Sequence, residues 1–256
     1  MADVWRGWVN LWWLPVVAAP FVGSLLGVLI ERLPAGEPVV FDRSRCRSCG
    51  ATLAPRDLIP LVSFALTRGR CRICGAPIGW FAPAIEAAAV LTALWAAAVV
   101  PMAWLWPTAA LGWVLLALAV IDARHLILPD PLTLPLIPAG LIVVVGVASP
   151  DRFPDHLIGA AVGLAASAAV RVLYRRLRGR EGLGLGDVKL LAAAGAWVGW
   201  QGLPWLLLVA AATALAVVLT VALVRRRLDA QAPIPFGPFL CLGFWLVWLY
   251  GAPAFG

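Results

Sequence analysis

The chain has 256 residues, of which 62% are hydrophobic and only 13% are charged. A soluble domain carries about 25% charged residues, so this composition excludes an ordinary soluble globular protein. The formal net charge of +7 is compatible with a nucleic-acid partner or with contact to a membrane surface, and the positions of the basic residues distinguish the two.

Apolar blocks of membrane-spanning length follow one another along the chain. A helix needs about 20 apolar residues to cross the hydrocarbon core of a bilayer. Eight segments approach this length, near residues 9–30, 81–100, 103–121, 132–148, 156–174, 188–201, 203–224 and 234–250. Segment 188–201 is short, and 132–148 contains prolines, which membranes tolerate where neighbours satisfy the freed backbone groups. The sequence predicts an all-α polytopic membrane protein with about eight transmembrane helices.

The first apolar block could be taken for a secretory signal. It carries Asp3 and a single Arg6, and it runs into a span-length segment without a convincing small-residue cleavage site. We therefore expect a retained first helix over residues 1–31.

The basic residues predict the orientation of these helices. Arginine clusters in 32–72, in 171–180 and in 225–227, and eight alternating spans with an external N-terminus put all three clusters on one face. An excess of Lys and Arg in short loops marks the cytoplasmic side of a membrane. The positive charge therefore indicates membrane topology and contact with anionic lipid, and no nucleic-acid partner is expected.

One polar insert, residues 32–80, interrupts the apolar blocks. It contains the repeated motifs "CRSCGA" and "CRICGA", which hold Cys46, Cys49, Cys71 and Cys74. Two CxxC turns can direct four thiolates at a tetrahedral zinc ion, and four thiolates leave no open position for catalysis. Disulfides are the alternative, but a cytoplasmic loop lies in a reducing compartment. We expect a structural zinc site in a small cytoplasmic insert, and Cys241 in the last span to be a packing residue.

Few acidic residues need more explanation than solvation. Asp122 ends one apolar span and Asp187 begins another, and the predicted topology brings both to the cytoplasmic face. Ionisable groups beside membrane helices are candidates for function. Two adjacent carboxyls could share a proton, one acting as base on a water and the other as acid. Asp130 and Glu86 also remain without an assigned role.

Other interpretations of these residues stay open on composition and topology alone. Each aspartate alone could be a helix cap, and a pair could be an ion path in a transporter. Gly184 and Gly186 suit close packing around Asp187, while Lys189 could tune a carboxylate or extend to the lipid headgroups. His125, one turn after Asp122, is expected to be solvated.

Four motifs in order along the chain carry a family resemblance. "GLGLGDVKLLAAAG" resembles the GxGD motif, and "IDARHLILPD" the other catalytic segment, of bacterial type IV prepilin leader peptidases/N-methyltransferases. "GSLLGVLIERLP" and "LIPLVSFALTRGRCRICGAPI" resemble the first helix and the second cysteine pair of that family. The resemblance implies that Asp122 and Asp187 are catalytic, with Gly184, Gly186 and Lys189 as supporting residues of the motif.

The resemblance also implies two reactions. One is cytoplasmic cleavage of the leader from type IV prepilins or type II secretion pseudopilins. The other is methylation of the new N-terminal amine with S-adenosylmethionine, an activity associated with the N-terminal region. It implies three parts: a first helix over 1–31, the methyltransferase-associated zinc insert over 32–80, and a peptidase domain over 81–256.

Three departures from the family pattern bear on methylation. Gly27 and Leu58 stand where asparagine is usual, and Trp80 replaces a basic residue, while Glu86 remains in the matching helix. A peptidase with a degenerate methyltransferase region is therefore an alternative, and an ion-coupled transporter is one of a different class. A broader presenilin-like protease also carries a GxGD loop, but the cysteine insert argues against it. The sequence predicts neither a cofactor pocket nor an oligomeric state.

Overall fold

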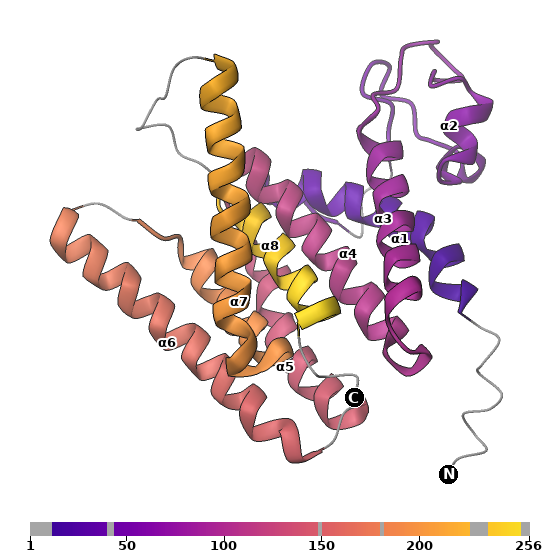
Figure 1. The fold of residues 1–256 in the computed structure, drawn as a ribbon. Helices are drawn as coiled ribbons and strands as arrows, with labels where there is room; N and C mark the ends of the chain where they lie inside the picture. The colour runs from indigo at the N-terminus through magenta and orange to yellow at the C-terminus, as the bar shows by residue number, and fades with distance from the viewer. Residues whose placement is uncertain (1–11, 40–43, 148–149, 180–181, 226–234, 252–256) are drawn as a thin grey trace, which may run out of the picture. The chain divides into compact units, whose positions relative to one another are not determined.

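The computed structural model describes residues 12–39, 44–147, 150–179, 182–225 and 235–251. Its helices are α1 (Trp13–Arg32), α2 (Val62–Leu66), α3 (Phe81–Val99), α4 (Met102–His125), α5 (Asp130–Val147), α6 (Phe153–Arg178), α7 (Leu185–Arg225) and α8 (Gly237–Leu246) (Figure 1). The only extended pairing among these residues consists of two isolated bridges. The predicted all-α architecture is confirmed.

Six of these helices are long and apolar enough to span a membrane, and a shorter apolar segment runs over Gly237–Gly251. The predicted spans 188–201 and 203–224 both lie within α7, which is interrupted at Gly199 with φ 70° and ψ 174°. Glycine is suited to this positive φ because it has no Cβ. The eight predicted segments are thus compatible with the described helices. The start of the first predicted span, residues 9–11, lies outside the described residues. So do four of the arginines: Arg6, Arg180, Arg226 and Arg227.

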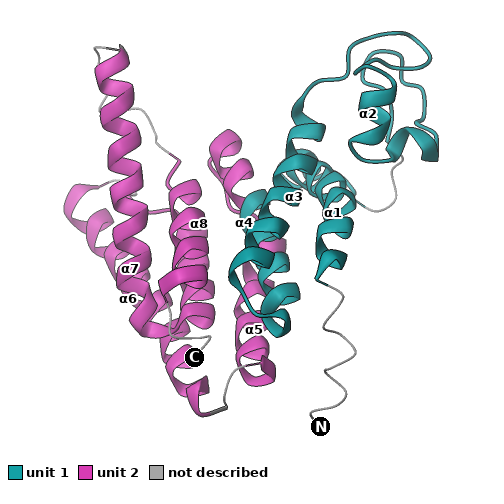
Figure 2. Cartoon of the chain, turned by 45° about the vertical axis from the view of Figure 1, so that its right-hand side comes forward, with its two compact units in different colours: residues 1–117 teal, residues 118–256 magenta. Residues whose placement is uncertain are grey.

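The chain divides into two compact units, residues 1–117 and 118–256, with the boundary inside α4 (Figure 2). In unit 1, α1 packs against α3. A Cβ placed on Gly23 of α1 would lie 2.6 Å from the Cα of Glu86 in α3. Small residues let membrane helices approach closely, so Gly23 fixes α1 beside Glu86.

Unit 2 is built around the packing of α6 against α7. A Cβ on Gly163 would lie 2.3 Å from the carbonyl oxygen of Leu191, and one on Gly159 would lie 2.4 Å from that of Gly195. This GxxxG contact makes the two helices antiparallel, because advancing four residues in α6 moves back four residues in α7. The C-terminal end of α6, with Arg175, Arg176 and Arg178, therefore lies toward the Asp187 end of α7.

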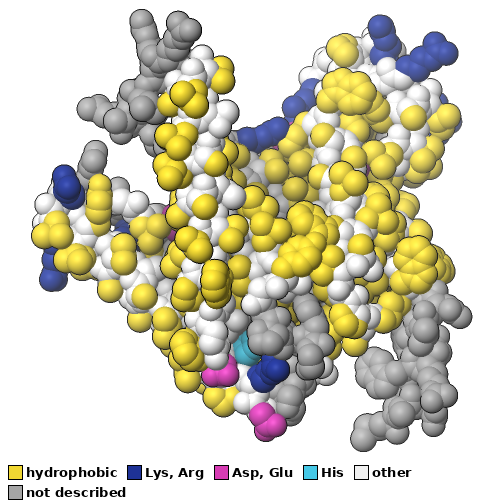
Figure 3. All heavy atoms as spheres, viewed as in Figure 1, with side chains coloured by type: hydrophobic (Ala, Val, Ile, Leu, Met, Phe, Trp, Pro, Cys, Tyr) yellow, Lys and Arg dark blue, Asp and Glu magenta, His cyan; other side chains and the backbone are white. Residues whose placement is uncertain are grey.

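The outer surface of unit 2 is apolar. Leu177 in α6 is 73% exposed and Leu223 in α7 is 79% exposed. Figure 3 shows hydrophobic side chains covering α6 and α7, with basic side chains gathered at one end of α6. Such surfaces suit contact with lipid tails, and charges at a helix end suit the headgroup region.

Candidate active site and cysteine cluster

Asp122 lies in the last turn of α4 and is 6% exposed. Its Oδ2 accepts a hydrogen bond of 2.9 Å from the backbone N–H of Gly237, the first residue of α8. The unpaired N–H groups at a helix start, and the helix dipole, favour a negative charge there. The buried carboxylate is therefore held by α8, a helix more than a hundred residues further along the chain.

Asp187 lies in the first turn of α7 and is half-buried. Its Oδ2 accepts a hydrogen bond of 3.2 Å from the N–H of Gly184, which directly precedes the helix. This is half of a capping box, in which a side chain in the first turn reaches back to the start of the helix. Asp187 therefore does act as a helix cap, through the hydrogen bond that it accepts from the Gly184 N–H.

The fold brings Asp122 and Asp187 together within unit 2. Their carboxylates lie near enough for their charges to interact. Cys241 is 3% exposed and belongs to no cysteine cluster, as expected of a packing residue. Among the described residues, only Oδ2 of each aspartate has a hydrogen bond, which leaves both Oδ1 atoms available.

Lys189 does not pair with either of these carboxylates. Its Nζ lies 2.6 Å from Oδ1 of Asp130, so the ion pair joins the first turn of α7 to the first turn of α5. Gly186 fits beside the loop before α5, since a Cβ there would lie 2.7 Å from the Cβ of Leu128. Lys189 and Gly186 therefore fix the position of the helix start that carries Asp187.

Gly237 is a site residue that sequence reasoning missed. Its signal is weak: a glycine before Pro238 at the start of an apolar segment. A Cβ there would lie 2.6 Å from Oδ2 and 2.7 Å from Cγ of Asp122. The absence of a side chain at residue 237 is what lets Asp122 reach the start of α8.

We predict that Gly237→Ala displaces Asp122 and lowers the leader cleavage that the motif resemblance implies by about 10²-fold, because a shift of about 1 Å at a catalytic group has an effect of that size. Cleavage of a prepilin peptide by the purified protein measures the effect. Gly146→Ala in α5 is the matched control, since a Cβ there meets nothing within 4 Å. Equal cleavage by the two variants would contradict the role of Gly237.

The cysteine insert of unit 1 contains one knuckle used twice. In the first, the N–H of Cys46 bonds to the carbonyl of Ala51, and that of Gly50 to the carbonyl of Cys46, each at 2.9 Å. Cys71, Ala76 and Gly75 repeat both bonds at the same lengths. Gly50 and Gly75 both have a φ of 70°, so each closes its turn in the left-handed conformation that glycine favours.

The four sulfurs converge as a metal site requires. The Sγ atoms of Cys46, Cys49, Cys71 and Cys74 all lie within 4.8 Å of one another, and no disulfide joins them. Those of Cys46 and Cys74 are 3.8 Å apart. Tetrahedral zinc at about 2.3 Å from each sulfur would separate them by about 3.8 Å. The donor set fits zinc, and the cluster could hold a metal ion.

The thiols of the cluster also share protons unevenly. Hydrogen bonds from the backbone N–H groups of Cys49 and Ser48 lower the pKa of Cys46 to about 6. For Cys74, a hydrogen bond from the Ala76 N–H lowers the pKa. Bonds to the other thiols, above all that of Cys49, outweigh it and raise the pKa of Cys74 to about 11. A divalent cation would remove this competition by favouring all four thiolates.

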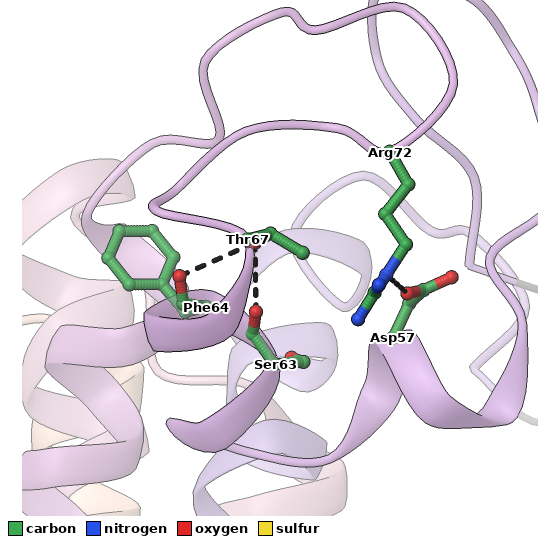
Figure 4. Close-up of polar contacts among 5 residues, drawn as sticks. All are labelled: Asp57, Ser63, Phe64, Thr67 and Arg72. Atoms are coloured by element: carbon green, nitrogen blue, oxygen red, sulfur yellow. Dashed lines mark hydrogen bonds and ion pairs between the residues drawn. The ribbon is translucent and has the colours of Figure 1, made fainter.

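Contacts around α2 support the second knuckle (Figure 4). Arg72 forms an ion pair with Asp57, which lies in the 3₁₀ turn Pro55–Leu58. The hydroxyl of Thr67 donates to the backbone carbonyls of Ser63 and Phe64, at 2.8 and 3.3 Å. The ion pair ties the segment between the two cysteine pairs to the second knuckle, and the Thr67 bonds close the end of α2.

The residues that depart from the family pattern lie in two places. Gly27 and Leu58 both line a cavity of unit 1. Trp80 is 76% exposed, lies outside this lining and contacts Phe64 with ring centroids 4.9 Å apart. His125 is exposed at the end of α4, as expected.

Comparisons with known proteins agree with the motifs. A model of the bacterial peptidase A24 N-terminal domain matches residues 17–100, and a model of the type IV leader peptidase family matches residues 109–220. No solved structure is significantly similar to the chain.

Several curated proteins named prepilin leader peptidase/N-methyltransferase align over most of their length. That of Aeromonas hydrophila is 38% identical over 260 residues, covering 90% of this chain and 87% of that protein. Those of Burkholderia pseudomallei (strain 1026b) and Dickeya chrysanthemi are also 38% identical, covering 93% and 86% of this chain and 85% and 86% of theirs. These matches confirm the resemblance in the motifs: the chain belongs to the type IV leader peptidase family.

Proposed function

We propose that this protein removes the leader peptide from type IV prepilins or type II secretion pseudopilins, with Asp122 and Asp187 as its catalytic pair. The observation that carries this proposal is that two carboxylates in unit 2, each at a helix end, lie near enough for their charges to interact. Each is fixed through one oxygen by a backbone N–H, while the other oxygen is available. An aspartyl peptidase needs two such carboxyls beside one water.

The arrangement supports hydrolysis by general acid–base catalysis. The ionised carboxylate takes a proton from water while the water oxygen attacks the carbonyl carbon of the peptide bond. The protonated partner donates its proton to the carbonyl oxygen. When the tetrahedral intermediate collapses, the amine nitrogen takes the proton that the first carboxyl removed from water, and the C–N bond breaks. The second carboxylate regains its proton from a hydroxyl of the intermediate. Gly184, Gly186 and Lys189 position Asp187 and take no part in these proton transfers.

We propose a position in the bacterial inner membrane with the catalytic pair at the cytoplasmic face. The arginine-rich end of α6 and the Asp187 end of α7 lie at the same end of unit 2, which supports this orientation under the positive-inside rule. An uncleaved basic leader at that face would be attracted by the two carboxylates.

We further propose that the chain methylates the new N-terminal amine, with S-adenosylmethionine as donor. The names of its relatives and the match of the N-terminal family model support this. We assign the first helix to residues 1–31, the methyltransferase-associated insert to 32–80 and the peptidase to 81–256. Zinc on the four cysteines would hold the insert folded and take no part in chemistry.

A single assay tests both activities. The full chain in lipid nanodiscs is incubated with a prepilin peptide and a methyl-labelled donor. We expect a shortened peptide that carries the label. An uncleaved peptide would contradict the peptidase assignment, whereas a cleaved but unlabelled peptide would leave a peptidase with a degenerate methyltransferase region.

A further inference from the structure

Unit 1 contains a cavity of about 300 Å³ where α1 and α3 meet the cysteine insert. Ser24 and Gly27 of α1, Glu86 of α3, and Cys46 and Cys71 of the knuckles are among the residues that line it. The volume is at the lower end of the range for small-molecule sites, about 300–1,000 Å³. Leader cleavage gives this cavity no use, and a zinc ion among the four sulfurs would account for only part of it, since Cys49 and Cys74 do not line it.

Glu86 is the buried acidic group of this cavity, with 6% of its surface exposed. Its Oε2 accepts a hydrogen bond of 2.7 Å from the N–H of Leu61, and Ser24 lines the same cavity. In the described part of the chain, Glu86 forms no ion pair. A buried carboxyl without a cationic partner is costly to ionise, so an acid at this position calls for a reason.

A purely structural role explains why residue 86 needs an oxygen but not why that oxygen belongs to an acid. The backbone makes a tight turn at Leu61, with φ 58° and ψ −47°, and the N–H of Val62 bonds to the carbonyl of Pro60 at 2.6 Å. Such a γ-turn with positive φ is rare and strained, and Glu86 fixes it by accepting the Leu61 N–H. The neutral amide of glutamine could accept the same hydrogen bond.

We propose that this cavity is the methyl-transfer site, and that Glu86 binds the N-terminal ammonium of the processed pilin and takes its proton. The proposal rests on the methyltransferase activity proposed above and adds Ser24 and Glu86 from the flanking helices to that region. Both reactants, the ammonium and the sulfonium donor, are cationic, and Glu86 supplies the buried anion that such groups require.

The reaction balances with these groups alone. An ammonium has no lone pair, so one of its protons first passes to the Glu86 carboxylate. The nitrogen lone pair then attacks the methyl carbon of the sulfonium, and the C–S bond breaks with its electron pair going to sulfur. The products are a methylated ammonium and a neutral thioether, and Glu86 releases its proton to solvent.

The test uses a synthetic pilin peptide that already has a free N-terminus, so that methyl transfer does not depend on cleavage. Glu86→Gln keeps the acceptor for Leu61 and removes the base. We expect its methyl transfer to fall by about 10²-fold or more near neutral pH. The loss should shrink as the pH rises through the pKa of an α-amino group, about 7.7–8.0, because the amine then deprotonates by itself.

A control and a second test variant accompany Glu86→Gln. Glu37→Gln changes an exposed carboxylate of unit 1 outside the cavity and should methylate like the wild type. Gly27→Leu fills the cavity: a Cβ at Gly27 meets nothing within 4 Å, so the larger side chain enters open space. We expect Gly27→Leu to lose binding of the labelled donor and methyl transfer. Leader cleavage and zinc content show whether each variant is folded.

The outcomes separate the inference from the proposed function. Wild-type protein that methylates no peptide would overturn the methyltransferase proposal and this site with it. Active wild type with an equally active Glu86→Gln, or with a loss that is the same at every pH, would overturn only the role of Glu86. Donor binding that survives in a folded Gly27→Leu would overturn the placement of the donor in this cavity.

Discussion

Replacing Asp187 or Asp122 with asparagine will lower cleavage of a prepilin peptide by about 10³-fold or more. Asparagine keeps an oxygen for the Gly184 or Gly237 N–H, so the two helix starts remain bound, but it can neither accept nor hold the transferred proton. General acid–base catalysis contributes about 10²–10⁴-fold, and removing one member of a cooperating pair removes most of their joint effect. Cleavage by each purified variant measures the loss.

Asp155→Asn is the matched control for both substitutions. Asp155 lies at the start of α6, where its Oδ1 accepts a hydrogen bond of 3.1 Å from Trp200, a bond that asparagine can also accept. We expect this variant to cleave like the wild type. If either catalytic variant still processed pilin, the pair would not be the peptidase site, and the ion-path interpretation of the two aspartates would gain support.

Replacing Cys46 or Cys71 with serine will reduce the zinc content of the purified protein to a small fraction of the wild-type value. Zinc binding supplies about 10–16 kcal/mol in small zinc domains, and it needs deprotonated thiols. The insert has only short helices and two isolated bridges, so little else holds its knuckles closed. Metal analysis and limited proteolysis within residues 44–79 measure the loss of metal and of folding.

Cys241→Ala provides the control, because Cys241 is buried in α8 and is no member of the cluster. It should keep its zinc and a protected insert. Full zinc content in the Cys46 and Cys71 variants would show that the four sulfurs do not form the metal site. Acidification should also release zinc from the wild type, since protons compete with the metal for the thiolates.

The membrane helices and the cysteine site were within reach of sequence reasoning for a physical reason. Membrane crossing requires continuous apolar stretches, so hydropathy alone located the long apolar helices and the shorter α8. The cysteine knuckle is equally local: six residues, one of them a glycine, determine its turn, and the repeat at Cys71 folds as that at Cys46 does. The break at Gly199 was less accessible, because a glycine within an apolar run has no distinct hydropathy signal.

The candidate site needed the tertiary structure. Sequence selected Asp122 and Asp187 as rare carboxylates at the ends of apolar spans, with motifs that resemble a known family. It did not predict that Lys189 pairs with Asp130, nor that Glu86 holds the turn at Leu61 and lines a cavity. Each of these contacts joins side chains on segments that are far apart along the chain.

The sequence by itself determined that this protein crosses a membrane, carries two cysteine knuckles and has two aspartates at the ends of apolar spans. Only the tertiary structure decided which groups surround those aspartates, and that a cavity exists beside Glu86. Hydropathy and motif spacing depend on neighbours along the chain. Hydrogen bonds such as that from Gly237 to Asp122 depend on where helices pack, which many weak contacts determine together.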